Sequence, residues 1–442
     1  MHRDSGRSVE AAAGRELHRE VRMNRRWGVI AAVVLVVVAG GVGCSGLFEV
    51  DPNPHTVSSD HPIGLQELMT GATATLYQSF DAKIVWGGLF GDEFVNSGTA
   101  PSIQNYDRRD VAPDQIGGGV GRGTGIGGSF YGNLQQAVVM SVEGRQRIRD
   151  GDFPEISAPG TDSPEYARLS MYTGFARTWM GDLFCTAAFG GHGPELTAAD
   201  VYAMAEGDFT EAINAGNAGG AVTQAALVGR ARVRLILGQD QEALADAQAV
   251  DPGFELTATY STNTVEEENR VWYRVWEFSN WSVGPAFRNL TIDDTGTPDP
   301  RVDLAVNPKP AFDASQDLYA PQKVRGANSP LRIATGDEAR YIIAEIQGGQ
   351  TAVDIINEVR SRHGITTQWS PSGGDPNEIR DKVIDERKRT LFLDGVRLGD
   401  LRRFIDKYSL DFFPTSTPQG FPMGDETCLP LPDVERNNNP DI

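Results

Sequence analysis

The chain has few residues that bind metals or act as nucleophiles. Cysteine occurs three times and histidine six times in 442 residues. The sequence contains no HExxH motif and no paired His/Cys spacing, and Asp293, Asp294 and Asp299 do not follow the spacing of an EF-hand loop. We therefore expect no metal site and no cofactor.

Positive charge is also scarce. The chain has 40 Lys and Arg against 60 Asp and Glu, which gives a formal net charge of −20. Such a surface repels phosphate backbones and anionic lipid headgroups. We expect no nucleic-acid partner, whereas the charge says little about a neutral ligand.

Catalytic motifs are missing as well. The glycine run Gly117–Gly128 contains a G-x-G-x-x-G arrangement, but no apolar strand precedes it and no GK[ST] follows it. We interpret this run as a flexible entry to a helix over Tyr131–Ile148. Because no nucleophile, base and orienting group can be assembled from the motifs present, we do not expect an enzyme.

The apolar run near the N-terminus is too short for a membrane span. It extends from Trp27 to Gly43, follows Arg25 and Arg26, and stops at Cys44, whereas a spanning helix needs about 20 residues. This order is typical of a secretory signal over residues 1–43 with lipid attached to Cys44. An ordinary signal peptide that leaves Cys44 as a plain thiol is the alternative, since Gly41 stands where a lipobox usually has Leu or Val.

Residues 1–43 contain seven arginines and four acidic residues. Their removal would leave 33 basic and 56 acidic residues, so that the mature chain would have a net charge of −23. The charged stretch before Met23 is unusually long for a signal, and we expect translation to start at Met23. With so few cations, membrane attachment would depend on the lipid at Cys44.

The most informative segment is Asp385–Phe404, DERKRTLFLDGVRLGDLRRF. Before and within it, apolar residues recur at helical spacing up to Leu391, Gly395 supplies a break, and a second short helix follows. We predict a partly buried ion-pair clasp made by Glu386, Arg387, Asp394, Arg397, Asp400 and Arg402. A catalytic carboxylate pair is the less favoured alternative, because interleaved arginines keep these acids ionised.

This segment resembles the C-terminal signature of the SusD/RagB family of outer-membrane lipoproteins. The matching residues are Glu386, Arg387, Leu391, Asp394, Gly395, Arg397, Asp400, Leu401 and Arg402. Upstream, Arg340–Gly364 is similar to the helical hairpin that precedes this signature, and Cys428–Pro440 is similar to the family's closing tail. Two departures are mild: Asp394 replaces a glutamate, and Phe404 stands where a tryptophan is frequent.

The resemblance implies a mainly α-helical, SusD-like fold, with incomplete tetratricopeptide-like hairpins and long irregular loop insertions in one domain over residues 44–442. It further implies a surface lipoprotein of the outer membrane. Such a protein binds a glycan or similar nutrient and passes it to a SusC-type TonB-dependent barrel. The alternative from another class is a tetratricopeptide-like assembly scaffold that binds no small ligand.

The residues also predict helical pairs directly. Ser163 and Pro164 form a cap and first turn, and Thr197 with Asp200 forms a capping box. The segment Ala225–Pro252 is typical of a tetratricopeptide hairpin with Gly238 at its turn. We expect such pairs around 163–250 and 337–364, with strands that are few and local.

Two long irregular regions, Ser79–Gly128 and Pro252–Ser329, are expected between the helical pairs, and binding sites concentrate on such loops. Aromatic faces stack on sugar rings, and arginine bonds their hydroxyls. The ligand-binding candidates are Trp86, Tyr106, Trp272, Trp276, Trp281 and Arg288. Packing in the core or in a short strand around Val271–Val275 is the competing interpretation for Trp272 and Trp276, and it applies less to Trp281, which lies among polar loop residues.

Beyond Cys44, the mature chain contains Cys185 and Cys428. An exported protein meets an oxidising compartment, so the two cysteines can form a disulfide that holds the C-terminal tail against the helical body. Two separate buried thiols are the alternative.

Overall fold

The computed structural model describes residues 63–442 except 118–129, 158, 294, 308–310, 313, 315 and 316. Gly64–Ile442 forms one compact unit. The expected signal peptide, the start at Met23, the lipid site at Cys44 and most of the glycine run lie outside the described residues.

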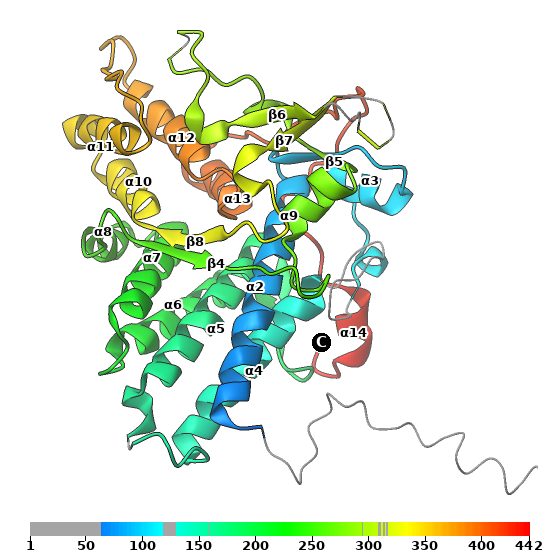
Figure 1. Ribbon diagram of the computed structural model, residues 1–442, viewed down its shortest axis with the longest axis vertical. Coiled ribbons are helices and arrows are strands. Elements are labelled where there is room, and N and C mark those ends of the chain that lie inside the picture. The colour runs from blue at the N-terminus through cyan, green and yellow to red at the C-terminus, as the bar shows by residue number, and fades with distance from the viewer. Residues whose placement is uncertain are drawn as a thin grey trace, which may run out of the picture. The chain divides into compact units, whose positions relative to one another are not determined.

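Helices make up most of this unit and pack in chain order (Figure 1). Its first part contains α2 (Leu65–Phe90), α4 (Phe130–Asp150), α5 (Pro164–Leu183), α6 (Ala198–Asn214), α7 (Gly220–Ile236) and α8 (Asp240–Gln248). The second part contains α10 (Gly336–Gln347), α11 (Gly349–Arg362), α12 (Glu378–Thr390) and α13 (Arg397–Tyr408). Each helix from α4 to α8 contacts the next, and α10 contacts α7, α8 and α11.

The local signals for the helical pairs are confirmed. The Ser163 side chain accepts a hydrogen bond from the Tyr166 amide at the start of α5, and Thr197 and Asp200 form the capping box of α6. Gly238 has a φ of +74° at the turn between α7 and α8, a conformation that favours glycine. The mainly α-helical architecture with helical pairs that the sequence predicts is therefore correct.

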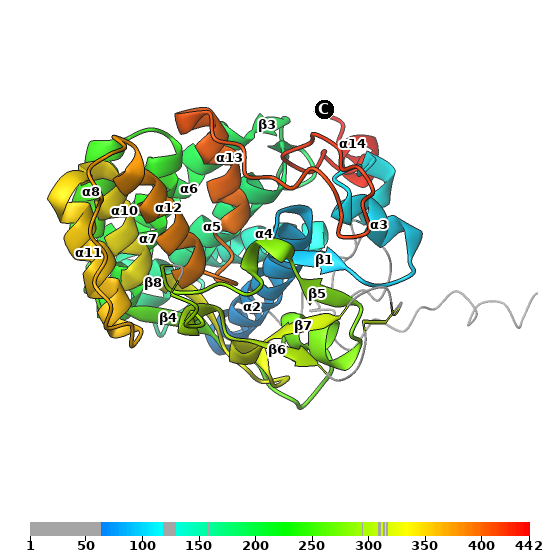
Figure 2. The same ribbon diagram turned by 90° about the horizontal axis from the view of Figure 1, so that it is seen from above.

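Strands are short and form two-stranded antiparallel sheets. The pairs are β1 (Phe94–Asn96) with β5 (Trp281–Val283), β2 (Thr186–Ala187) with β3 (Leu196–Thr197), β4 (Glu255–Ala258) with β8 (Leu331–Thr335), and β6 (Leu304–Asn307) with β7 (Leu318–Pro321). Seen from above, β1, β5, β7 and α3 (Pro101–Asp107) lie away from α7, α8, α10 and α11 (Figure 2).

Short turns of helix complete the described elements. They are the 3-10 turns Pro113–Gln115, Gly160–Asp162, Pro285–Phe287, Pro300–Val302 and Gln322–Val324, together with α9 (Arg270–Trp272), a π-helical turn (Tyr273–Glu277) and α14 (Asp433–Asn438). The short strand expected around Val271–Val275 is therefore wrong, because this segment is helical. The expected irregular region also starts too early, since Ser79–Phe90 belongs to α2.

The C-terminal tail is held against the end of α5. Cys185 and Cys428 form a disulfide with their sulfurs 2.00 Å apart. Next to it, the Cys185 amide donates to the Leu429 carbonyl at 2.9 Å, and the Leu429 amide donates to the Leu183 carbonyl at 2.8 Å. The disulfide and the two backbone hydrogen bonds thus fix the tail at the same place.

The ion-pair clasp joins distant parts of the chain. Within the segment, the Arg387 guanidinium pairs with Asp400 at 2.7 Å. Glu386 pairs with Arg301 and Arg360, each at 2.6 Å.

The remaining clasp residues also have partners outside the segment. Arg397 pairs with Asp92 at 2.6 Å, and Asp394 pairs with Arg332 at 2.6 Å. Arg402 donates instead to backbone carbonyls at the end of α5, at 2.6 and 3.0 Å. The clasp is therefore a link between the C-terminal helices and the rest of the unit.

Candidate functional site

Three of the predicted ligand-binding aromatics are core residues. Trp86, Tyr106 and Trp281 expose 1%, 0% and 0% of their surface. The ring of Trp86 lies 4.7 Å from that of Tyr106 and 5.4 Å from that of Trp281, measured between centroids. Because these rings pack on one another, they have no free face for a sugar, and their prediction as ligand contacts is wrong.

The other three predicted residues, Trp272, Trp276 and Arg288, are half-buried. Trp276 donates its indole N–H to the Pro321 carbonyl at 3.3 Å. The Arg288 guanidinium donates to the Val283 carbonyl at 2.7 Å and stacks 4.3 Å from the centroid of the Tyr319 ring. Their role in binding stays a prediction, and the structure does not bring them into the groove described next.

An open groove of about 810 Å³ runs along α2. Its floor consists of residues in two rows at i, i+4 spacing, which share one face of a helix: Leu65, Gln66, Met69, Thr70, Thr73, Ala74, Tyr77 and Gln78. At 1.5 Å per residue this stripe is about 20 Å long. The groove is therefore long enough for an extended oligomer.

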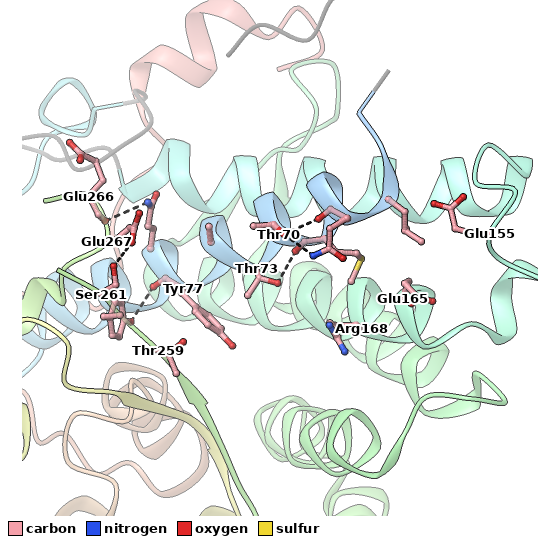
Figure 3. Close-up of a pocket in the computed structure, with 16 residues that line it drawn as sticks. Thr70, Thr73, Tyr77, Glu155, Glu165, Arg168, Thr259, Ser261, Glu266 and Glu267 are labelled. Carbon is pink, nitrogen blue, oxygen red and sulfur yellow. Dashed lines mark hydrogen bonds between the residues drawn. The ribbon is translucent and has the colours of Figure 1, made fainter. Parts of the chain in front are cut away.

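Two other parts of the chain form the walls (Figure 3). The figure shows Glu155 and Glu165 toward one end and Ser261, Glu266 and Glu267 toward the other. Thr70, Thr73 and Tyr77 lie between them, and Arg168 lies between Glu165 and Thr73.

One wall of the groove is the loop Thr259–Glu267, which is bound to α2 by hydrogen bonds. The Tyr260 hydroxyl donates to the Tyr77 carbonyl at 3.2 Å, and the Gln78 side chain donates to the Glu266 carbonyl at 3.5 Å. The helix therefore positions this loop.

The groove combines apolar surface with polar groups that can bond a ligand. Burial raises the pKa of Tyr77, and the nearby Tyr172 hydroxyl adds to this effect while Arg168 opposes it. Burial also raises the pKa of Tyr260 well above its ordinary value. Both phenols therefore stay neutral at physiological pH. Since Tyr260 already donates its proton to the Tyr77 carbonyl, the Tyr77 hydroxyl can donate to a ligand and the Tyr260 hydroxyl can accept from one. The exposed Arg168 adds a cationic donor without a hydrogen-bond or ion-pair partner among the described residues.

A second cavity, of about 340 Å³, lies beside β8 and the clasp. Its cations already have partners, since Arg332 pairs with Asp394 at 2.6 Å and Lys323 lies 3.3 Å from the same carboxylate. Arg301, in the same wall, is paired with Asp299 and Glu386. The groove along α2 is the better candidate, because it is larger and its polar groups are less occupied.

Two further properties concern only the part of the chain that the structure describes. No group of three or more His, Cys, Asp or Glu side chains there could hold a metal ion. Over the same residues, we find no helix with both the length and the apolar character needed to cross a membrane.

The sequence did not identify the groove residues. Thr70, Thr73 and Tyr77 lie on α2, a helix that the sequence does not predict. Arg168 and Tyr260 come from segments far along the chain. A signal was present in the polar and small residues at four-residue spacing from Gln66 to Gln78, which mark an exposed helix face.

Comparison with known proteins agrees with the architecture. Residues 338–442 match the model of the SusD family. No curated protein matches the chain significantly.

Solved structures match over most of the chain. One is a SusD superfamily protein from Bacteroides vulgatus ATCC 8482, with 17% identity, a TM-score of 0.65, and coverage of 86% of this chain and 98% of that one. A laminarin-binding SusD-like protein matches with 15% identity and a TM-score of 0.63, and surface glycan-binding protein A from Bacteroides uniformis with 14% and 0.62, both at the same coverage.

At these identities the structural matches establish the fold, and the family match covers the three C-terminal segments in which the resemblance was found. The resemblance read from the sequence is thereby confirmed. The chain has the SusD-like fold, and its C-terminal part, residues 338–442, matches the SusD family model.

Proposed function

We propose that this chain is a binding protein that takes an oligosaccharide or a similar nutrient oligomer in the groove along α2. The observation that carries the proposal is the groove itself: an open channel of about 810 Å³ with a floor of regularly spaced small, polar and aromatic side chains. A sugar ring offers one apolar C–H face and a rim of hydroxyls. Tyr77 suits the face, and Thr70, Arg168 and the glutamates suit the rim.

The comparisons support a carbohydrate as the ligand class. Two solved proteins with the same fold are described as laminarin-binding and as glycan-binding. The proposed role is capture rather than turnover, because the lining of the groove offers hydrogen-bonding groups and contact area to a ligand.

The proposed location is the outer membrane, with the chain anchored by lipid on Cys44 and facing outward. From there it would pass its ligand to a SusC-type TonB-dependent barrel. This part rests on the order of the N-terminal segment and on the family resemblance. Co-purification from native outer membranes with a large barrel in stoichiometric amount would support it, whereas recovery of envelope-assembly proteins alone would favour the scaffold alternative.

Calorimetric titration of the full chain with a panel of oligosaccharides measures binding affinity and tests whether the groove is the binding site. Tyr77→Ala removes the aromatic face from the centre of the groove, and we expect it to weaken the affinity about tenfold, which corresponds to about 1.4 kcal/mol. Arg168→Ala removes the cationic donor and should weaken the affinity to a similar extent.

Trp276→Ala is the matched comparison, because Trp276 is a half-buried aromatic outside the groove. If the binding site were the surface around Trp276 and not the groove, Trp276→Ala would abolish binding and both groove variants would leave binding intact. Thermal melts of each variant separate loss of binding from loss of folding. Saturable binding of any oligosaccharide excludes a scaffold without a small ligand.

A further inference from the structure

The groove along α2 carries an excess of negative charge. Its lining includes four carboxylates, Glu155, Glu165, Glu266 and Glu267, and one guanidinium, that of Arg168. The carboxylates of Glu155, Glu165 and Glu266 form no hydrogen bond or ion pair with another described residue. Glu267 accepts a hydrogen bond from Ser261. Three carboxylates are therefore open to a ligand.

The placement of these charges matters more than their number. Glu155 and Glu165 lie at one end of the groove, and Glu266 and Glu267 lie at the other, with uncharged Thr70, Thr73 and Tyr77 between them (Figure 3). A ligand that fills the groove lengthwise meets a carboxylate at each end, whichever direction its chain runs.

We propose that the groove selects uncharged or amino-bearing oligosaccharides and rejects chains with an acid group on each sugar. This inference rests on the proposed function and specifies its substrate class. Carboxylates accept hydrogen bonds from hydroxyl groups and pair with ammonium groups. Against a polyuronate they place like charges side by side, which costs binding free energy and slows approach.

Arg168 does not reverse this preference. A single guanidinium can pair with one acid group of a ligand, so that a chain with one terminal carboxylate is accepted. A polyuronate brings further charges that find no cation in the groove, and the net charge of −20 of the chain adds repulsion at long range. The excluded class is therefore the polyanion, not every acidic ligand.

The test compares hexasaccharides that differ in charge, by calorimetric titration of the full chain at low salt. The neutral set contains β-glucan, xylan and mannan hexamers, the amino probe is a chitosan hexamer, and the acidic probes are galacturonate and alginate hexamers. We expect the acidic probes to bind at least about tenfold more weakly than the best neutral or amino probe. The difference should shrink near 1 M salt, where the Debye length is about 3 Å.

A double variant locates the origin of the selectivity. Glu155→Gln with Glu266→Gln removes one unpaired carboxylate from each end, and we expect the ratio of acidic to neutral affinity to rise about threefold or more. The matched control is Glu242→Gln with Asp406→Asn, which removes the same charge from exposed positions on α8 and α13. This control should leave the ratio unchanged.

The outcomes separate the two proposals. If an acidic hexamer binds as tightly as the best neutral one, the selectivity is wrong while the binding function stands. If both double variants change the ratio equally, total charge and not the groove sets the preference, and the inference is overturned. If none of the hexamers binds, the proposed function fails, and the selectivity fails with it.

Discussion

At the residue scale, Asp107 is a carboxylate that the fold keeps away from water. It exposes 4% of its surface and accepts a hydrogen bond from the Asn96 amide at 3.1 Å. Burial raises the pKa of Asp107 to about 7, although this hydrogen bond and Arg108 act in the opposite direction. The folded state therefore holds this proton more tightly than the unfolded state does.

The raised pKa of Asp107 makes the free energy of unfolding depend on pH. Between the ordinary aspartate pKa of about 4 and the folded value of about 7, the unfolded chain releases the proton first, so the free energy of unfolding falls as the pH rises. Asp107→Asn keeps an oxygen acceptor and removes the titration. We expect the variant to gain roughly 2–4 kcal/mol relative to wild type between pH 4 and pH 8.

Urea unfolding at a series of pH values measures this difference. Asp406→Asn, at an exposed position of α13, should run parallel to wild type over the same range. A constant offset between Asp107→Asn and wild type at all pH values would show that Asp107 titrates normally, which would contradict the prediction.

Single residues also show where the sequence was informative and where it was not. Trp86 and Tyr77 belong to the same helix, nine residues apart, yet one is in the core and the other lines the groove. Composition identifies both as aromatic and says nothing of which neighbours cover them. The capping signals at Ser163 and Thr197 were reliable because the interaction is local.

At the scale of elements, close contact between helices depends on positions without a side chain. A Cβ atom added at Gly229 of α7 would lie 2.3 Å from the Phe209 ring of α6. We expect Gly229→Ala to lower the free energy of unfolding by about 1–3 kcal/mol, because the ring and the helix have to move apart.

Gly207 of α6 is the matched control. It lies in the same helical pair, and a Cβ added there meets no atom within 4 Å. Gly207→Ala should therefore raise the free energy of unfolding by about 0.5–1 kcal/mol through helix propensity alone. Chemical denaturation measures the free energy of unfolding of both variants against wild type. If Gly229→Ala were more stable than wild type, α6 and α7 would be less tightly packed than described.

Whether a helix keeps an exposed face explains which elements could be predicted from the sequence. The α7–α8 hairpin has one buried and one exposed face, so its sequence shows helical periodicity. In α2, every residue from Ser79 to Phe90 is buried. A segment covered on all sides has no polar face and loses its period, and Gly87 and Gly88 added a loop-like signal. For this reason the sequence of Ser79–Phe90 indicates an irregular region, although the segment is helical.

At the scale of the whole molecule, buried ion pairs join segments that are distant in sequence. Arg403 of α13 donates to Glu345 of α10 at 2.7 Å and to Asp400 at 2.9 Å. Burial alone would raise the pKa of Asp400, but Arg387 and Arg403 outweigh it and lower the pKa to about 2. Arg403 likewise lowers the pKa of Glu345 against the effect of burial. Both carboxylates are therefore ionised in the folded state at neutral pH.

The consequence for the whole unit is a loss of stability in acid that depends on Arg403. Because the folded pKa of Asp400 lies below its ordinary value of about 4, its contribution is present above that value and disappears as the pH falls toward about 2. Arg403→Met leaves Glu345 and Asp400 with less compensating charge, and we expect it to cost about 3–5 kcal/mol at pH 7.

The cost of Arg403→Met should become smaller near pH 3, because the two carboxylates can then take up protons and no longer need the guanidinium. Arg436→Met is the matched control, since Arg436 pairs with Glu195 at the surface with 45% and 29% of the two side chains exposed, and such pairs contribute at most about 1 kcal/mol. Urea unfolding of wild type and both variants at pH 7 and pH 3 gives the change in the free energy of unfolding for each variant at each pH. If Arg403→Met costs the same at both pH values, its effect comes from lost packing of the arginine stem, and the ion pairs do not couple α10 to α13.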